Sequence, residues 1–250
     1  MPIGPHKTTA RLHALLDRLL CPRPFGAHRE KNVNLVRIWD LPTRLFHGAL
    51  ILAFVGLIAT AQIGGSAMEW HFRCGYAVVA LLLFRLVWGW VGGYWSRFAQ
   101  FISSPAAALA YARTPFEQRP PSTGHNPMGA WSVLAILLAL GLQVTAGLFS
   151  DDEIATAGPL VPYASGQWVS LATRYHTSIG KLAVFALLAL HVATVLYYRH
   201  KRKIDLITPM VSGDKLLPEG TPASKDSAGT RVLALVVLGV IAVGVAVLLG

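Results

Sequence analysis

Four histidines lie in long apolar stretches of the sequence, where an imidazole ring is costly unless it has a partner. They are His47, His71, His176 and His191. Separate hydrogen bonds to nearby carbonyl groups would account for one or two such rings. For all four, ligation of haem iron is the better explanation, because imidazole is a standard axial ligand of haem. The histidines therefore predict two haems, each held by a pair of rings.

The composition indicates which elements carry these rings. Of the 250 residues, 54% are hydrophobic and only 14% are charged, and the mean hydropathy is +0.50. A helix needs about 20 apolar residues to cross roughly 30 Å of hydrocarbon. The predicted spans are 44–61, 71–91, 129–149, 176–198 and 232–249. We therefore predict an all-α integral membrane protein, in which a four-helix transmembrane bundle binds two b haems and a fifth C-terminal transmembrane helix anchors or packs.

The net charge of +10 follows membrane topology and does not indicate nucleic-acid binding. Lys and Arg number eight up to Arg44, three between the second and third spans, and seven from Arg199 to Arg231. The other two loops carry Glu69 and the acidic residues 151–153, with Arg174 as the single base. The excess of bases predicts that the first three segments face the cytoplasm of a bacterial inner membrane, with the N-terminus inside.

This topology divides the chain into four predicted regions. Residues 1–35 form a basic cytoplasmic N-terminal tail without the apolar core and cleavage site of a signal peptide. Residues 36–203 form the dihaem membrane domain, 204–230 a linker rich in Pro, Gly and Ser, and 231–250 the C-terminal helix. Cys21 and Cys74 form no CxxC or CxxCH motif, so the sequence predicts neither a disulfide nor a covalently attached haem.

Depth in the membrane predicts how the histidines pair, because two rings share one iron only at the same depth. His47 lies near the inner end of its span and His191 near the inner end of the fourth span. His71 and His176 both lie at the outer end. His176 and His191 are 15 residues apart, which is roughly 22 Å along a helix and suits two stacked haems. At about 100° per residue this separation passes four full turns by about 60°, so the two rings share only a broad face.

Several residues near the predicted pairs are candidates for holding haem propionates or steering a reactant. Arg85, 14 residues after His71 in the second span, needs an anion, and a propionate of the inner haem is the preferred partner. A snorkelling structural arginine is the alternative. His125, just before the third span, could touch a propionate or a quinone, or simply cap its loop. Arg73, Arg174 and Lys181 cluster at the outer end, where they bind propionates, attract an anion or form a solvated rim.

Two glycines follow the outer histidines at helical spacing. Gly75 comes four residues after His71, and Gly180 four residues after His176. A missing side chain one turn along the ligand's face gives room to a flat macrocycle, but small residues also serve close contact between helices. The sequence leaves both interpretations open.

The sequence resembles the prokaryotic cytochrome b561 family, which is related to the b-type cytochrome subunits of nickel–iron hydrogenases. The similarity extends from about residue 35 to 215 and rests on VRIWDLPTRLFH (36–47), LFRLVWG (83–89), GHNP (124–127), TAGLF (145–149) with Asp151 and Asp152, HVA (191–193) and PMVSG (209–213). The resemblance implies four core helices, two b haems ligated by histidines of helices one, two and four, and electron exchange with quinone or a redox partner. The four histidines match those ligand positions.

The expected function is electron transfer between the quinone pool and a periplasmic redox partner, such as a cytochrome c. The family resemblance also allows a superoxide:quinone oxidoreductase, with Arg73, Arg174 and Lys181 steering the anion. A membrane transporter or anchor subunit without haem is the alternative from another class, and a reduced-minus-oxidised spectrum separates it from the first two.

Overall fold

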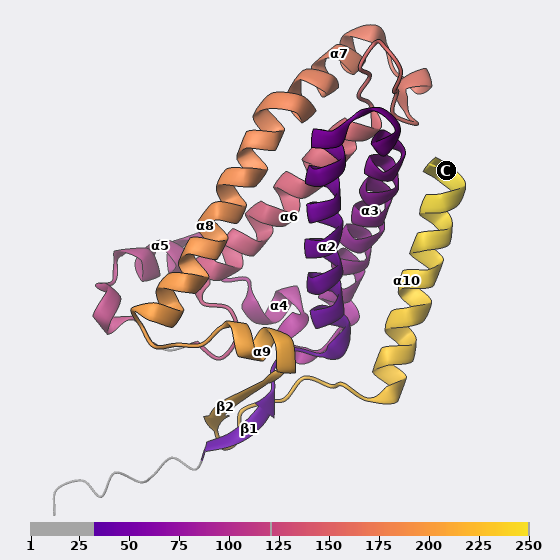
Figure 1. Cartoon of the computed structure of the whole chain (residues 1–250). Helices are drawn as coiled ribbons and strands as arrows, with labels where there is room; N and C mark the ends of the chain where they lie inside the picture. Colours follow the sequence, from indigo (N-terminus) through magenta and orange to yellow (C-terminus); the bar gives the residue numbers. More distant parts are fainter. Residues whose placement is uncertain (1–32, 121, 250) are drawn as a thin grey trace, which may run out of the picture.

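The computed structural model describes residues 33–120 and 122–249 and is mostly helical (Figure 1). Of the predicted tail, only residues 33–35 fall within the described part; the rest lies outside it. The predicted spans are confirmed as five helices that are long and apolar enough to cross a membrane, among the residues described. These are α2 (Leu41–Ile63), α3 (Met68–Val91), α6 (Pro127–Leu148), α8 (Gly180–His200) and α10 (Ala228–Leu249).

Shorter elements join the long helices. The described part also contains α4 (Phe98–Phe101), α5 (Pro105–Arg113), α7 (Gly166–Arg174), α9 (Ile207–Ser212), β1 (Val33–Arg37) and β2 (Asp214–Pro218), with 3₁₀ turns at 65–67, 94–96, 116–118 and 161–163. A π-helical turn, η5 (Tyr175–Ile179), runs from α7 directly into α8. Elements α4, α5, α9, β1 and β2 lie at one end of the bundle and α7 at the other (Figure 1).

Local sequence signals explain where the helices begin and turn. An Asp, Asn or Ser with a proline one or two residues later starts three of them. The side chains of Asp40, Asn126 and Ser104 each accept a hydrogen bond from a backbone N–H of the first turn. Between α2 and α3, Gly64 and Gly65 have φ of +67° and +53°, a conformation that glycine adopts without strain. The two helices therefore form a tight antiparallel hairpin.

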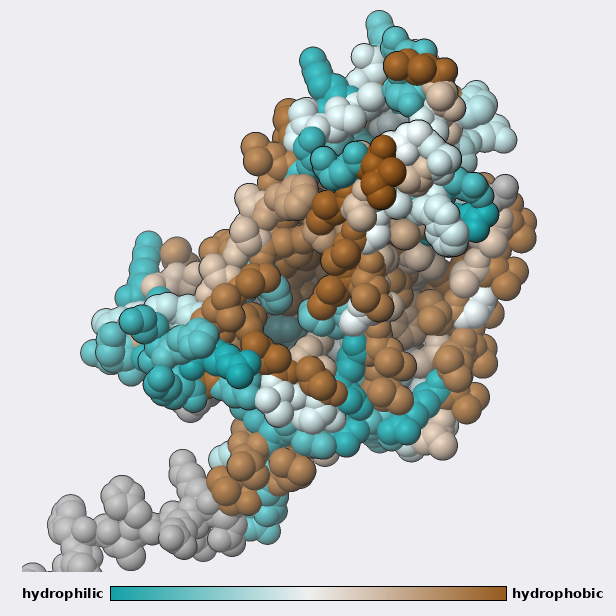
Figure 2. Space-filling view, viewed as in Figure 1, coloured by the Kyte–Doolittle hydropathy of each residue, from teal (hydrophilic) through white to brown (hydrophobic). Residues whose placement is uncertain are grey.

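The helices pack in two pairs around a buried middle layer. Helix α2 packs on α3, and α6 packs on α8 and α3. Val78, Leu82, Leu140 and Val184 are the buried side chains of this layer, drawn from α3, α6 and α8. Between α8 and α2 the surface is hollowed and its rim is mostly apolar (Figure 2). The rings of Phe54 and Phe185 face each other across this space, with centroids 5.9 Å apart.

The fifth helix packs on the opposite side of the bundle from α8. Helix α10 lies against α3, and its buried Ala234 joins a cluster with Phe46, Phe84 and Trp88. Val245 is also buried, whereas other large side chains of α10, such as Val236 and Leu248, are exposed. This helix therefore covers the face of the α2–α3 pair that points away from α8.

A two-stranded antiparallel sheet at the base of the bundle departs from the all-α prediction. Strand β1 pairs with β2, with Leu35 opposite Leu216. A two-stranded sheet is only marginally stable by itself. This sheet is stabilised by a small hydrophobic core of Val36, Ile38 and Leu217. The segment 204–230, predicted as a linker, thus contains a helix and a strand that pack beneath the bundle.

Ion pairs tie the segment before α10 to this base. Arg37 contacts both Asp214, at 2.6 Å, and Asp226, and Arg231 contacts Asp226 at 3.0 Å. Burial by itself raises the pKa of Asp226, but hydrogen bonds from Arg231, the Leu41 backbone and Arg37 outweigh it and lower the pKa. Asp226 therefore stays ionised between its two arginines at neutral pH.

Candidate functional site

The structure brings His71 and His176 together at the end of the bundle near α7. His71 lies in the first turn of α3, and His176 lies in the π-helical turn η5 that leads into α8. Their ring centroids are 6.2 Å apart and their planes cross at 88°. Both residues are half-buried. We call this the outer pair.

Backbone carbonyls set the proton positions on both rings of the outer pair. His71 Nδ1 lies 3.1 Å from Leu57 O, and His176 Nδ1 lies 2.9 Å from Gln143 O. A carbonyl oxygen only accepts hydrogen bonds, so each Nδ1 must carry the proton. Each Nε2 then keeps a free lone pair, which is the tautomer that a metal ligand requires.

The spacing of the outer pair fits an iron atom between the two rings. Two imidazoles that bind one metal through nitrogens at about 2 Å each have centroids roughly 6 Å apart. The observed 6.2 Å is close to this value, and with planes at 88° it is also the distance of an edge-to-face contact between two rings. The spacing of the pair is therefore compatible with one iron atom between the rings.

The two glycines near the outer pair have different surroundings. A Cβ built on Gly75 meets no atom within 4 Å, so this position leaves open space one turn from His71. A Cβ on Gly180 would meet Gln143 Oε1 and lie 2.5 Å from the Tyr175 ring. Gly75 therefore suits a flat macrocycle, whereas Gly180 allows close packing of α8 on α6.

His47 of α2 and His191 of α8 lie near the other end of the bundle and form the inner pair. Both are half-buried, and they are close enough for their charges to interact. The π turn accommodates one extra residue that adds no rotation about the helix axis. The 15-residue separation of His176 and His191 therefore corresponds to 14 helical steps of about 100°, which together fall about 40° short of four full turns. The sequence predicted a rotation about 60° beyond four full turns, and the π turn changes this angle. His176 and His191 therefore lie on nearly the same face of the continuous helix formed by η5 and α8.

Beside the inner pair, two buried side chains each have a nitrogen without a hydrogen-bond partner among the described residues. Arg85 is only 5% exposed, and its Nη1 has no hydrogen-bond partner. Its guanidinium lies 4.8 Å from the centre of the Phe98 ring. His125 packs between Trp39 and Phe101, with centroids 4.9 and 4.6 Å away, and its buried Nδ1 also lacks a partner.

Electrostatics link these two donors to the inner pair. Burial, with smaller contributions from the charges of Arg85 and His191, lowers the pKa of His125 to about 4. The ring is therefore neutral at neutral pH, next to a guanidinium without a full set of acceptors. Buried polar groups are rarely left unpaired, so Arg85 and His125 suit a carboxylate such as a haem propionate.

Asp40 holds the inner ends of α2 and α3 together, a role that the sequence analysis did not identify. Its carboxylate is fully buried and accepts hydrogen bonds from Trp88 Nε1 at 3.1 Å and Ser96 Oγ at 2.9 Å. It also accepts from the backbone N–H groups of Thr43 at 2.8 Å and Gly93 at 2.9 Å. Its negative charge reaches Arg85. The buried carboxylate thus positions the segment that carries His47.

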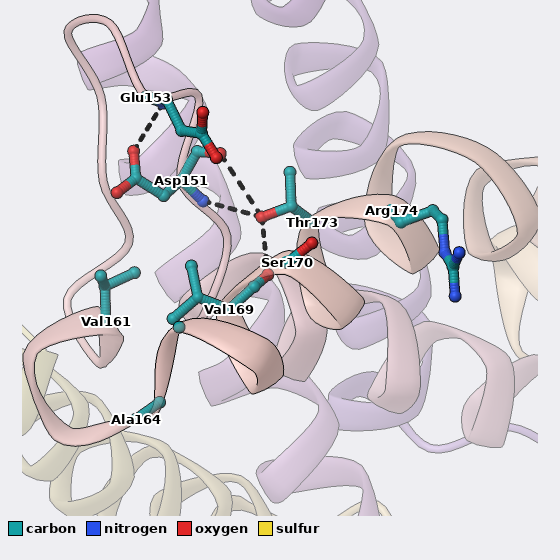
Figure 3. A pocket seen from close by; sticks show the side chains of 9 residues that line it. Asp151, Glu153, Val161, Ala164, Val169, Ser170, Thr173 and Arg174 are labelled. Atoms are coloured by element: carbon teal, nitrogen blue, oxygen red, sulfur yellow. Dashed lines mark hydrogen bonds between the residues drawn. The ribbon is translucent and has the colours of Figure 1, made fainter.

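The three bases that were predicted to cluster at the outer end have different surroundings. Arg73 forms an ion pair with Glu69 and lies over the Trp70 ring at 4.9 Å. The charge of Lys181 reaches His176. Arg174 points away from Asp151 in the close view of the loop (Figure 3). Lys181 is therefore the base with a direct electrostatic effect on the outer pair.

An open pocket of about 500 Å³ lies next to the outer end of α7 (Figure 3). Asp151, Glu153 and Arg174 contribute its charged lining. The third predicted acid, Asp152, accepts hydrogen bonds from three backbone N–H groups and from the Thr156 hydroxyl. The Thr156 contacts are the main cause of its lowered pKa. Asp152 thus shapes the loop, while Asp151 and Glu153 are the acids of the pocket.

Gln143 is the second site residue that the sequence analysis missed. Its backbone oxygen holds the His176 ring, and its side-chain Nε2 donates to His176 O at 2.9 Å. A signal was present, since Gln143 is the one carboxamide in the predicted span 129–149. A polar side chain within a membrane helix usually has a partner across a helix interface.

Comparison with known families gives one match. The model of a family described as prokaryotic cytochrome b561 matches residues 38–213, which include all four histidines of the two pairs. No curated protein and no solved structure matches the chain.

Proposed function

Because the chain belongs to the prokaryotic cytochrome b561 family and is a membrane b-type cytochrome of electron transfer, we propose that it binds two b haems. His71 and His176 ligate the outer haem, and His47 and His191 ligate the inner one. His176 lies in the turn just before α8 and His191 lies 15 residues further along, so the haems are stacked across the membrane. Electrons pass between them along the bundle.

The observation that carries this proposal is the geometry of the outer pair. The rings stand 6.2 Å apart with both Nδ1 atoms hydrogen-bonded to carbonyls, which leaves both Nε2 lone pairs available to a metal. Hydrogen bonding of the non-ligating nitrogen to a backbone carbonyl is the usual support of a metal-binding histidine. The inner pair is supported by its equal depth on α2 and α8 and by the two unpaired donors beside it.

The residues of the chain would perform three tasks around the haems besides ligation. A bound haem supplies a one-electron couple, and its potential depends on the axial ligands, their hydrogen bonds and the surrounding dielectric. Leu57 O and Gln143 O make the outer ligands more basic by accepting from Nδ1. Arg85 and His125 hold a propionate of the inner haem. Phe54 and Phe185 fill the space between the two pairs and exclude water from it.

The proposed partners are a membrane quinone and a periplasmic redox protein, with the chain in the bacterial inner membrane and its N-terminus in the cytoplasm. The described parts of the base-rich segments, which leave out residues 1–32, lie at the end with the inner pair, as the positive-inside rule requires of cytoplasmic segments. At the other end, Asp151 and Glu153 line an open pocket near the outer pair. Acidic residues there would attract a cationic partner such as a cytochrome c.

The proposal is tested on the full chain purified in detergent. Extraction of haem as a pyridine complex should give two b haems for each chain, and the reduced-minus-oxidised spectrum should show a b-type α band. A quinol should reduce both haems, and an oxidised basic cytochrome c should then reoxidise them. Protein that carries no haem would exclude the proposal, and reduction by quinol without reoxidation by the cytochrome would exclude only the periplasmic partner.

A further inference from the structure

His176 lies at an unusual point of the backbone. The chain runs helically from α7 to α8, but Tyr175–Ile179 form a π turn with hydrogen bonds between residues five apart. Such turns are uncommon, frequently occur at functional sites and need a specific cause. Residues 166–200 contain no proline, so that common cause of helix distortion is absent. The contacts of the π turn with α6 supply a different cause of the distortion.

Gln143 makes two hydrogen bonds with the same histidine in opposite directions. Its side-chain Nε2 donates to His176 O, and its backbone oxygen accepts from His176 Nδ1, both at 2.9 Å. The first bond holds the backbone of the π turn, and the second fixes the rotation of the ring. Two bonds to one residue therefore determine both where the imidazole lies and how its plane is oriented.

Small residues on both helices make this contact possible. A Cβ on Gly147 would lie 2.8 Å from His176 Cε1, and a Cβ on Gly180 would overlap Gln143 Oε1. These distances are shorter than van der Waals contact. Glycine at both positions thus admits the histidine ring on one side and the glutamine side chain on the other.

The opposite ring of the outer pair is fixed independently. His71 Nδ1 lies 3.1 Å from Leu57 O and 3.3 Å from the Thr60 hydroxyl. Since each ring is held by its own helix partner, the angle of 88° between their planes follows from the packing of α2 on α3 and of α6 on α8. A bound haem would accept these orientations.

We infer that Gln143 is a positioning residue that holds His176 across from His71 with the imidazole planes crossed, and so sets the electronic character of the outer haem. This inference rests on the proposed function. Each imidazole raises the iron d orbital that points along its ring normal. Crossed rings raise two orbitals almost equally, so the ferric low-spin centre has a strongly anisotropic electron paramagnetic resonance signal, whereas parallel rings give a more rhombic one.

The test compares two substitutions on adjacent positions of α6 in the full, haem-loaded chain. Gln143→Met keeps the length of the side chain and the backbone oxygen, but it removes the donor that holds the backbone of His176 in place. Leu142→Met introduces the same side chain at a lipid-facing position that is 50% exposed. The signal of the outer haem is identified as the one lost in His71→Ala. We expect Gln143→Met to move that signal towards rhombic and to shift the outer midpoint potential, while the inner haem and Leu142→Met stay unchanged.

A second variant reaches the same contact from the other helix. Gly180→Ala displaces the Gln143 side chain without altering it, so it should change the outer signal in the same direction. Combining Gly180→Ala with Gln143→Met should change that signal little beyond the change seen in either single variant. If Gln143→Met fails to retain the outer haem, the signal of Gly180→Ala decides whether Gln143 positions His176.

Several results would contradict the inference. An outer signal that is rhombic in the wild type would show that the planes are not crossed. An outer signal unchanged in Gly180→Ala, or unchanged in a haem-loaded Gln143→Met, would remove the positioning role while leaving the dihaem proposal intact. Wild-type protein with fewer than two haems would instead overturn the proposed function and, with it, the premise.

Discussion

At the scale of the residue, the four intramembrane histidines differ in how firmly the protein holds them. The outer rings each donate a hydrogen bond from Nδ1 to a backbone carbonyl. The inner rings instead lie beside Arg85 and His125, whose unpaired atoms face the same region. The outer site is therefore organised by the backbone and the inner site by buried side chains.

Pairing of the histidines can be tested with double substitutions. Each single change to alanine should remove about half of the haem, because each ring serves one iron. His47→Ala with His191→Ala should retain the other half, as should His71→Ala with His176→Ala, whereas His47→Ala with His71→Ala should retain none. Haem extraction from the purified variants measures this. Half-retention in the mixed pair would contradict the assignment.

Arg85 should influence only the inner haem. Replacing Arg85 with Met removes a buried cation, and a positive charge near a haem favours the reduced state. A unit charge at roughly 10 Å with an effective dielectric constant of about 20 interacts by about 1.7 kcal/mol. We therefore expect the inner midpoint potential to fall by tens of millivolts, measured by potentiometric titration.

The control for Arg85→Met is Arg113→Met, which removes an exposed cation from α5 on the same side. It should leave both potentials unchanged because solvent screens its charge. Arg85→Lys keeps the positive charge, so its inner midpoint potential should stay close to that of the wild type. A fall of equal size in both haems, or in the Arg113 variant, would rule out a direct effect of Arg85 on the inner site.

At the scale of the element, the caps decide how firmly each helix end is held. Asp40 caps α2 and at the same time accepts hydrogen bonds from Trp88 and Ser96 on the α3 side. Ser104 caps α5 in the same way, with proline next, but at an exposed position. The two caps have one local role in common and differ in burial.

Asp40→Ala should therefore destabilise the protein far more than Ser104→Ala. Loss of an exposed cap costs about 1 kcal/mol, whereas Asp40→Ala also leaves buried donors unpaired, at about 1–3 kcal/mol each. We expect a total loss of more than about 3 kcal/mol for Asp40→Ala, measured as the unfolding midpoint in detergent. Equal losses in the two variants would show that Asp40 acts only as a cap.

At the scale of the whole molecule, the arrangement of the ends decides which haem faces which compartment. The described parts of the base-rich segments lie with β1, β2, α4 and α5 at one end, and α7 lies at the other (Figure 1). Basic segments remain on the cytoplasmic side during membrane insertion. The loop that precedes α7 should therefore face the periplasm.

Cysteine labelling from each side of the membrane tests this orientation in a chain whose native cysteines are replaced. Ile154→Cys is suited to the α7 end because Ile154 is 91% exposed, and Glu117→Cys lies exposed at the opposite end. An impermeant maleimide should label position 154 only from the periplasm and position 117 only from the cytoplasm. Labelling of position 154 only from the cytoplasm would reverse the topology.

The sequence by itself determined the five spans, the basic end and the depth at which each histidine lies. These properties follow from composition and helical geometry, because a bilayer imposes a length on every apolar helix and a side on every cluster of bases. The family resemblance was confirmed over residues 38–213 for the same reason, since its motifs are local.

Only the tertiary structure decided how the rings are held. The bond from His176 to Gln143 O and the bonds from Trp88, Gly93 and Ser96 to Asp40 join residues that are far apart in the chain. The pairing of β1 with β2 joins residues 177 to 185 positions apart, from Arg37 with Asp214 to Val33 with Pro218, and likewise has no local signature. Such contacts depend on which helix faces lie together, because a single backbone carbonyl or a buried carboxylate finds its partner only once the helices have packed.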